Sequence, residues 1–271
     1  MPVHFNSILN EQNKGSEELQ NSILNGILQN DLQNPDDVYV NKDKNKFTIT
    51  KYIIDINKNE KVGKSVITMM TNEEQKAHEV IDIDLTLLSD KPIKLNFENK
   101  LDKSSDSNEY YDVIIDNNDV HCQIETVNRL AKEEKSIIGT VQDVYISIFP
   151  FQLNVFNTID DFNKEYGFSK PIKVGETDLE VHGYSEEFAG PGGMLRGNTD
   201  EICSFIIGKV VSYKDITGII GGIKVPFTII NLKTAFGIVP VAASRDTFDL
   251  SNLSENKIIV MFADVKADFL K

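Results

Sequence analysis

The chain is poor in the residues and motifs that usually identify an enzyme. It has two cysteines in 271 residues, Cys122 and Cys203, and no CxxC pair. This excludes a disulfide framework and a cysteine-rich zinc site. We interpret Cys122 as a buried structural thiol, and whether either cysteine is reactive stays open. No HExxH, nucleophile-elbow, kinase or phosphate-loop motif occurs. The sequence therefore predicts no metal and no cofactor, and it favours a non-catalytic protein.

Long apolar runs and signal-peptide features are also missing. The longest apolar runs, such as residues 258–263, are too short to span a bilayer. The first 20 residues contain neither a basic region nor an apolar region of the signal-peptide kind. We therefore expect a soluble, cytoplasmic protein without a membrane partner.

Arginine is scarce, with three residues in the chain, and the net charge is −14. Residues 203–271 hold eight basic and six acidic side chains, so the rest of the chain carries −16. An acidic body repels phosphates, which disfavours nucleic-acid binding. We favour a solubilising surface as the role of these acids. A DNA mimic or a site for a basic partner is the alternative.

The clearest positive signal is alternation of apolar and polar residues with a period of two. It occurs over residues 81–87 and again over residues 264–269, and it is typical of half-buried antiparallel strands. The sequence thus predicts a mainly β fold, a β-rich α+β class with antiparallel strands and a few short helices. We expect the charged side chains of these two runs to form solvated faces, with cation binding or acid–base chemistry as the alternative: Asp82, Asp84, Asp264, Lys266 and Asp268.

Composition divides the chain into four parts. Residues 1–15 are polar and patternless, which predicts a disordered terminus. Residues 16–183 are expected to form an acidic, β-rich N-terminal module, and residues 184–200 a Gly-rich linker. Residues 201–271 are expected to form a C-terminal β-barrel-like module. No internal repeat is detectable in the sequence.

A short helix is predicted to follow Thr158. Asp161, three residues further on, completes a capping-box pattern, and Gly167 provides a natural C-terminal stop. Phe162 and Tyr166 are expected to form the buried side of this helix.

The C-terminal module has the most regular pattern. From Cys203 to Phe262 we expect strand, strand, strand, helical turn and strand, with a fifth strand over residues 265–270. This is the order of an OB-like barrel, whose first strand bends at a mid-strand glycine such as Gly208. A generic antiparallel sandwich is the alternative.

The stretch GPGGMLRG holds the most distinctive candidate site. Glycines let backbone amides approach an anion, and an arginine adds a bidentate fork. Glu186 and Glu187 precede the stretch and would repel a phosphate, so we favour a hinge over a ligand loop. The residues of this candidate ligand or hinge loop are Gly190, Gly192, Gly193 and Arg196.

Three functions remain open, and no reaction can be named. We prefer a non-catalytic binding or assembly protein that acts through contacts with an unidentified protein partner. The second function is single-stranded nucleic-acid binding on the C-terminal barrel, with bases stacked on exposed aromatic rings beside a basic groove. The groove would contain Lys209, Lys214, Lys224 and Lys233, and the rings would be those of Phe205, Tyr213, Phe227 and Phe236. The third is an enzyme whose site is assembled only by tertiary contacts.

Overall fold

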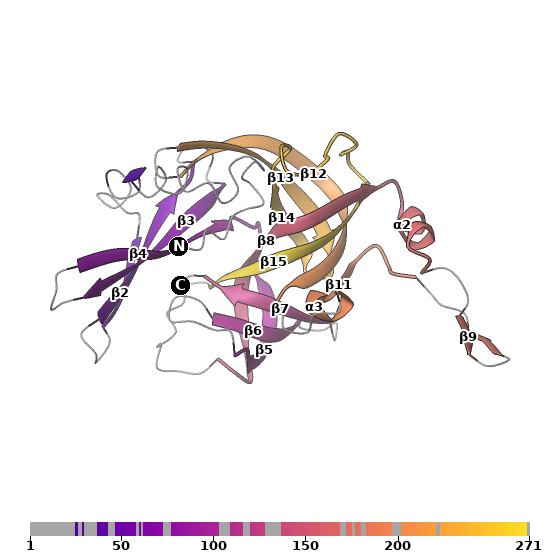
Figure 1. Ribbon diagram of the computed structural model, residues 1–271, viewed down its shortest axis with the longest axis horizontal. Helices are drawn as coiled ribbons and strands as arrows, with labels where there is room; N and C mark the ends of the chain where they lie inside the picture. Colours follow the sequence, from indigo (N-terminus) through magenta and orange to yellow (C-terminus); the bar gives the residue numbers. More distant parts are fainter. Residues whose placement is uncertain are drawn as a thin grey trace.

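The computed structural model describes most of the chain beyond its N-terminal region. The described residues are 25–26, 29, 37–42, 47–57, 60, 62–72, 77–102, 109–115, 120–127, 137–168, 172–174, 177–179, 183–196, 202–220 and 223–269. The predicted disordered terminus lies outside them. The described part is strand-rich, with antiparallel and mixed sheets and little helix, which confirms the predicted fold class (Figure 1). Within this part, no helix combines the length and the apolar character that crossing a membrane requires.

A four-stranded antiparallel sheet forms the first unit of the fold. Its strands lie in sequence order: β1 (Asp37–Lys42), β2 (Phe47–Asp55), β3 (Gly63–Asn72) and β4 (Ala77–Leu87). Each strand pairs with the next one along the chain, so only short connections are needed to form this sheet.

A nine-stranded sheet forms the larger unit. Its strands lie in the order β11, β12, β13, β14, β8, β15, β7, β6, β5. In chain order they are β5 (Ile93–Lys100), β6 (Glu109–Ile115), β7 (Val120–Thr126), β8 (Thr140–Phe156), β11 (Phe188–Pro191), β12 (Ser204–Ile220), β13 (Ile223–Thr234), β14 (Gly237–Ala243) and β15 (Ile258–Phe269).

Two additional pairings close this sheet on itself. β12 also pairs with β15, and β8 also pairs with β5. One closed ring of strands is therefore β12-β13-β14-β8-β15, and the other is β5-β6-β7-β15-β8. The two rings share β8 and β15, and each adds a three-strand meander. The contacts of β14 with β8 and of β15 with β7 are parallel, and the other pairings are antiparallel.

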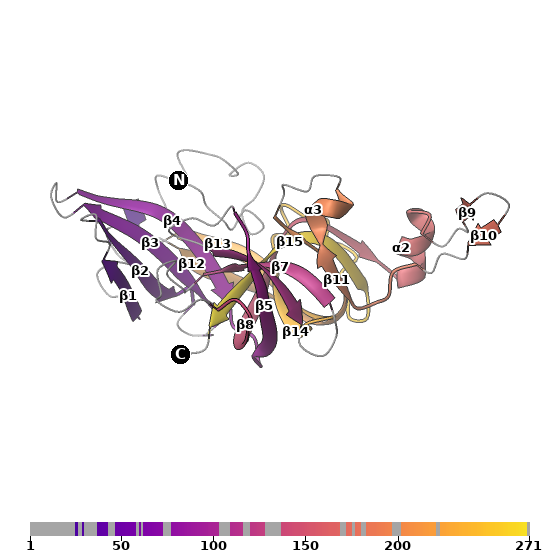
Figure 2. The ribbon, with the colours of Figure 1, turned by 90° about the horizontal axis from the view of Figure 1, so that it is seen from below.

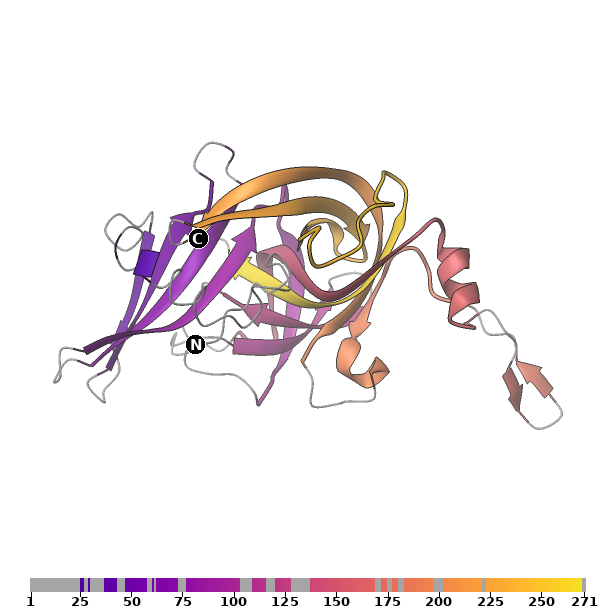
Figure 3. The same cartoon turned by 45° about the horizontal axis from the view of Figure 1, so that its top comes forward.

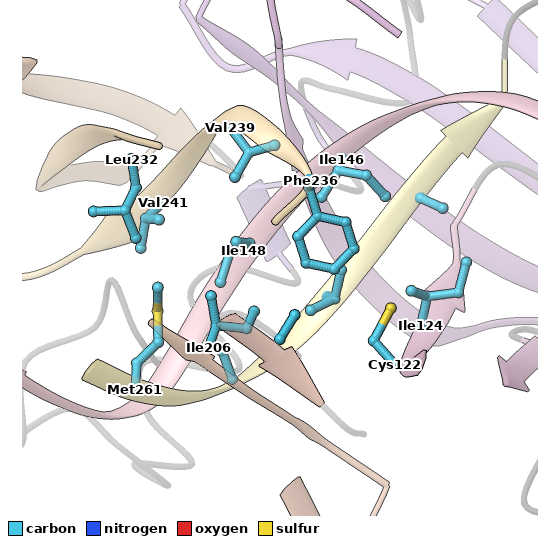
Figure 4. Packing of buried hydrophobic residues seen from close by; sticks show 14 of the residues in the cluster. Cys122, Ile124, Ile146, Ile148, Ile206, Leu232, Phe236, Val239, Val241 and Met261 are labelled. Carbon is cyan, nitrogen blue, oxygen red and sulfur yellow. The ribbon is translucent and has the colours of Figure 1, made fainter. Parts of the chain in front are cut away.

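Apolar side chains from both rings form one continuous core. Residues from β7, β8, β12, β13, β14 and β15 point toward one another there (Figure 4). Ile146, Ile206 and Val241 are fully buried in it. Because complete burial of such a side chain contributes about 1.5–3 kcal/mol, this core is the main source of stability for the two rings.

Gly208 lies where β12 changes partners. Residues 204–209 of β12 pair with β15, and residues 209–220 pair with β13. A Cβ atom at Gly208 would lie 2.6 Å from the Leu232 side chain and 2.7 Å from the carbonyl oxygen of Lys233. The strand crosses between its two neighbours at this point, and only a glycine fits there.

The far end of the β12–β13 hairpin extends over the four-stranded sheet (Figure 3). The Ile219 amide donates a hydrogen bond of 2.8 Å to the carbonyl oxygen of Ile56. Apolar residues of both units form one cluster at this contact, among them Ile67, Leu85 and Phe227. The two sheets are therefore packed against each other.

The segment between β8 and β12 is an insertion beside the rings. It contains α2 (Ile159–Glu165), the hairpin of β9 (Ile172–Val174) and β10 (Thr177–Leu179), β11 and α3 (Gly192–Leu195). α2 and the β9–β10 hairpin project from one end of the molecule (Figure 2). The predicted capping box is present, because the Thr158 side chain accepts from the Asp161 amide and the Asp161 side chain accepts from the Thr158 amide. Gly167 has a φ of +76°, as a helix stop requires.

One detail of the C-terminal prediction differs from the structure. The fifth strand expected over residues 265–270 is wrong, because β15 runs without interruption from Ile258 to Phe269. The fifth place in the ring is taken instead by β8, from the other side of the expected linker. The turn after Ser244 is present as a single turn, in which the Phe248 amide donates to the Ser244 carbonyl oxygen.

The linker expected over residues 184–200 contains a sheet strand. β11 pairs with the first residues of β12, and strands from both sides of it share the nine-stranded sheet. The division into an N-terminal and a C-terminal module stays a prediction about folding units, and this topology gives a direct way to test it.

We expect protein cleaved within residues 184–200 to remain one particle. β8 lies between β14 and β15, so residues 201–271 alone would lose the strand that joins them. Limited proteolysis followed by native size-exclusion chromatography should show the two fragments eluting together and separating in denaturant. Isolation of a stable, folded fragment starting near residue 201 would instead support two independent modules.

Ile207→Asp should unfold the protein at ambient temperature. Ile207 is fully buried on β12 beside Phe205, and an unpaired buried carboxylate costs several kcal/mol, out of a typical total stability of about 5–15 kcal/mol. Circular dichroism during a thermal melt measures the loss. Val211→Asp is the matched control, because Val211 is an exposed residue of the same strand. Equal melting temperatures for the two variants would contradict the prediction.

Candidate functional site

An aromatic cluster covers the outer face of β8, β12 and β15. On β15, Val260 and Phe262 lie on the face opposite the core of the rings, and Phe205 of β12 pairs directly with Phe262. α2 and the residues after it cover this face, and Phe162 is buried there. Most of the aromatic side chains lie in edge-to-face or tilted contact, as in the Tyr184–Phe205 pair with ring centroids 5.3 Å apart. Such contacts contribute about 0.5–1.5 kcal/mol each beyond the area they bury.

The cluster is incompletely filled and leaves an open pocket of about 290 Å³. Its floor is formed by β8, β12 and β15, and its walls by α2, α3 and the residues that follow α2. Tyr166 and Leu195 are 51% and 49% exposed at its edge. The residues that line it are Gln152, Asn154, Phe162, Tyr166, Phe168, Tyr184, Leu195, Phe205, Val260, Met261 and Phe262.

One wall of the pocket is fixed by a reciprocal side-chain to backbone contact. The Asn163 amide group donates to the Tyr184 carbonyl oxygen at 2.9 Å, and the Tyr184 amide donates to Asn163 Oδ1 at 2.9 Å. A Cβ atom at Gly183 would lie 2.4 Å from the Asn163 side chain, so a side chain at this position would displace the Asn163 amide group. Two wall segments of the pocket, α2 and the residues around Tyr184, are therefore joined to each other.

Arg196 stands at the rim of the pocket. Its guanidinium carbon lies 5.1 Å from the centre of the Phe151 ring and 5.5 Å from that of Phe262. Cation–π contacts of this kind contribute about 0.5–1 kcal/mol at exposed sites. The Arg196 amide donates to the Gly192 carbonyl oxygen, and the Gly192 amide donates to the Cys203 carbonyl oxygen. The turn that carries Arg196 is thus attached to the start of β12.

The predicted glycine loop is therefore a structured rim. Gly190 belongs to β11 and pairs with Phe205, while Gly192 and Gly193 start α3 and are buried. A Cβ atom at Gly192 would lie 2.7 Å from the Cys203 sulfur. These glycines allow close packing on β12, and the loop brings Arg196 to the pocket.

The pocket offers binding contacts and little acid–base chemistry. Among the described residues that line it, Tyr166 and Tyr184 are the titratable ones, and burial raises the pKa of Tyr184. Gln152 and Asn154 add two exposed carboxamides, which are hydrogen-bonding groups without an ionisable proton. This arrangement can hold an apolar or aromatic group and orient it by hydrogen bonds.

The four predicted groove lysines do not form one row. Lys209 lies 3.5 Å from Glu186, Lys214 lies 2.6 Å from Glu60, and Lys233 lies 2.6 Å from Glu187. Lys209 and Lys233 face each other across β12 and β13, whereas Lys224 lies opposite Ile219 near the hairpin end. Three of the four lysines are thus in contact with a carboxylate.

The aromatic residues proposed for base stacking are mostly inside the protein. Phe205, Phe227 and Phe236 are buried, and Tyr213 is exposed. Because stacking on a nucleobase needs an accessible ring, this arrangement gives the nucleic-acid hypothesis little structural support.

A second group of polar residues is buried between the two sheets. Lys51, Asp82 and Asp84 come from one face of the four-stranded sheet, and Glu125 and Lys266 come from β7 and β15. Lys51 donates to the Val127 carbonyl oxygen at 2.7 Å, and Lys266 donates to Asp84. Each sheet therefore contributes a lysine that reaches the other sheet.

This burial overturns the expectation of solvated faces for Asp82, Asp84 and Lys266. All three are at most 1% exposed, and Asp264 and Asp268 are partly buried. The alternation correctly separates the two faces of each strand. The alternation does not show that a second sheet covers the polar face, because the contact between Lys266 and Asp84 joins residues 182 positions apart in the sequence.

Burial and neighbouring charges shift the ionisation of this cluster. Burial raises the pKa of Glu125 to about 8, with Asp84 adding to the rise and Lys266 opposing it. Burial lowers the pKa of Lys51 against the attraction of Asp84 and Asp82. For Lys266, the attraction of Asp84 and Glu125 outweighs burial and raises the pKa. Groups of three or more His, Cys, Asp or Glu residues suited to a metal ion are absent from the described part of the chain.

A smaller pocket of about 220 Å³ lies between β12, β13 and the turn after Ser244. Two of its charged residues, Asp215 and Arg245, are bonded to each other. Thr228 donates to Asp215 Oδ1 at 2.6 Å, and Arg245 Nε donates to the same oxygen at 3.0 Å. We therefore take the aromatic pocket as the candidate functional site.

Most of this pocket is not predicted by the sequence. Phe162 and Tyr166 were expected on the buried side of α2, but only Phe162 is buried, and Tyr166 is half exposed. The remaining lining residues come from strands far apart in the chain. The spacing of Phe162 and Tyr166 by four residues was the available signal, since it places both rings on one side of a helix.

Comparison with known proteins assigns neither a family nor a function to this site. No family model, no curated protein and no solved structure matches the chain.

The buried charge cluster predicts a specific pH dependence of stability. Between about pH 5 and 8, folded Glu125 holds a proton that the unfolded chain releases, so the free energy of unfolding should fall as pH rises, by about 1 kcal/mol per pH unit. Glu125→Gln should flatten this slope. Urea unfolding at several pH values measures it, with Glu165→Gln as the exposed control on α2. A slope that is the same in Glu125→Gln and in the unmodified protein would contradict the assignment.

Proposed function

We propose that this protein is a non-catalytic binding protein that recognises a protein partner through the aromatic pocket. The partner would insert one aromatic or large apolar side chain between α2 and the outer face of β8, β12 and β15. The observation that carries the proposal is the open pocket itself, which is lined by six aromatic rings and edged by exposed apolar side chains.

The size of the pocket supports a single side chain as the occupant. Its volume of about 290 Å³ lies just below the range of about 300–1,000 Å³ that is usual for sites of drug-sized ligands. Binding between proteins is commonly dominated by a few aromatic or arginine anchors that fill such pockets. A pocket of this kind therefore fits an anchor from a larger partner.

The edge of the pocket supports the same interpretation. Phe151, Tyr166 and Leu195 are all substantially exposed around it, and Arg196 lies among them. Exposed apolar groups that gather at one place with a polar rim are typical of protein contact sites.

The competing functions receive less support from the described residues. For an enzyme, the pocket lining supplies two tyrosines and two carboxamides as its polar groups. For nucleic-acid binding, three of the four lysines contact carboxylates, and three of the four aromatic rings are buried.

A display selection with random peptides tests this proposal. We expect the enriched peptides to share an aromatic or large apolar residue at one position. Their binding should weaken about tenfold or more in Asn154→Phe, because the added ring occupies the pocket and removes the burial of the anchor. Asn154 is an exposed β8 residue, so this variant should fold normally.

Val141→Phe is the matched control for that selection. It adds the same ring at an exposed position of the same strand, away from the pocket. Peptides without a common anchor, or peptides that bind the two variants equally well, would contradict the proposed function.

A further inference from the structure

β8 has an unpaired edge beside the aromatic pocket. Resting on the proposed function, we infer that the partner binds in an extended conformation, as a strand added to residues 151–156 of β8, and that this strand carries the anchor that fills the pocket. Three features of the described residues support the inference: the hydrogen bonds of this edge, the position of the pocket beside it, and the side chains that the edge itself presents.

One edge of β8 is paired along most of the strand, whereas the other edge is paired only in its first part. β15 pairs with β8 between residues 144 and 156 on one side. On the other side, β5 pairs with residues 140–144, and β14 pairs with Ile148. Pro150 follows, and because proline has no backbone N–H it cannot donate to a ladder. Among the described residues, no backbone group bonds to residues 151–156 on this second side.

The chain that follows β14 forms its backbone hydrogen bonds elsewhere. The Phe248 amide donates to the Ser244 carbonyl oxygen within the turn. The Asn256 amide donates to the Val210 carbonyl oxygen on β12. In an antiparallel pair, successive residues direct their N–H and C=O groups alternately toward the partner strand and away from it, so about half of those in residues 151–156 point away from β15. Because unpaired backbone groups need contact with water, this edge is accessible, and a partner strand can reach it.

The pocket lies directly beside this edge. Gln152 and Asn154 line it from β8, and both are exposed. A strand added to a sheet lies about 4.7–4.9 Å from its neighbour, and its side chains alternate between the two faces. Every second side chain of the added strand therefore lies on the same face as the pocket. In strand addition, main-chain hydrogen bonds provide affinity, and pockets for alternate side chains provide specificity.

The side chains of the edge favour a different protein over a second copy of this chain as the occupant. If two β8 edges paired with each other, Gln152 and Asn154 of one copy would face the pocket of the other. The ring of Phe156, the next residue on this face, is already packed on Phe162. Carboxamides would leave the six aromatic rings of the pocket without a large apolar contact, whereas an aromatic anchor buries its apolar surface against them.

A synthetic peptide tests the inference. The probe is an acetylated peptide amide with a central tryptophan, three threonines on each side of it and a lysine at each end. Threonine favours an extended backbone, and the terminal lysines oppose aggregation of the free peptide. The chain contains no tryptophan, so the indole fluorescence of the peptide reports binding without background. Single N-methyl groups on the peptide backbone then remove one hydrogen-bond donor at a time and leave the charge unchanged.

We expect the effect of N-methylation to alternate along the peptide. Methylation at every second position should weaken binding about tenfold, because those N–H groups donate to β8. Methylation at the positions between them should change the dissociation constant less than about twofold, since those N–H groups point to solvent. Asn154→Phe should abolish binding of the unmethylated peptide, and Val141→Phe, the matched control on the same strand, should leave it unchanged.

The outcomes separate this inference from the proposed function, which the display selection tests independently. If all N-methylated peptides bind equally and Asn154→Phe abolishes their binding, the pocket accepts an anchor without an added strand, and the inference is wrong. Losses at consecutive positions, or no binding at about 1 mM peptide, also contradict it. If sedimentation shows a dimer that the peptide dissociates, the occupant of the edge is a second copy, and the inference is again wrong.

Discussion

The pairing of β8 with β15 is the constraint on which the rest of the structure depends. The two strands are paired antiparallel along almost the whole of β15, and both strands belong to both rings. The inner face of β15 contributes Ile259, Met261 and Ala263 to the common core. Its outer face has a different composition along its length. Ile258, Val260 and Phe262 lie in the aromatic cluster, and Lys266, further along the same face, lies in the buried charge cluster.

This division of one strand face has an energetic consequence. Burying Lys266 without an ionised partner would cost several kcal/mol. The aromatic and charged halves of the strand can therefore share one face only if Asp84 is held beside Lys266. The four-stranded sheet supplies Asp84. Removal of one partner is costly, whereas the intact pair gives little net stability. The cluster therefore contributes mainly to the position of one sheet on the other, and the apolar contacts around Ile67 and Phe227 supply the attraction.

The sequence predicts local features well because they depend on neighbours in the chain. The capping box at Thr158 and the stop at Gly167 both follow from short-range chemistry, and both are present. The alternating runs likewise assign each residue to a face. What covers a face is a long-range property, which is why Asp82 and Asp84 were expected in solvent and are buried against β15. The same reason hides the pocket, whose floor and walls come from segments separated by up to about one hundred residues.

The two rings are built alike, although the sequence shows no repeat. In each, a meander of three strands leads to a long strand that pairs with the first strand of its own meander: β8 with β5, and β15 with β12. Each long strand is also parallel to the last strand of the other meander: β8 with β14, and β15 with β7. An arrangement repeated in this way can persist while side chains diverge, because backbone hydrogen bonds define it.

The candidate site does not follow this repetition. It exists where α2, Tyr184 and α3, all from the insertion between β8 and β12, cover the outer face of the shared strands. One fold can serve many functions, and the function is determined by the segments and side chains that form a site on that fold. For this protein, the insertion supplies the walls of the pocket and the Arg196 rim, so its residues are where recognition of a partner would be encoded. The shared pair of strands supplies the rigid floor that such recognition requires.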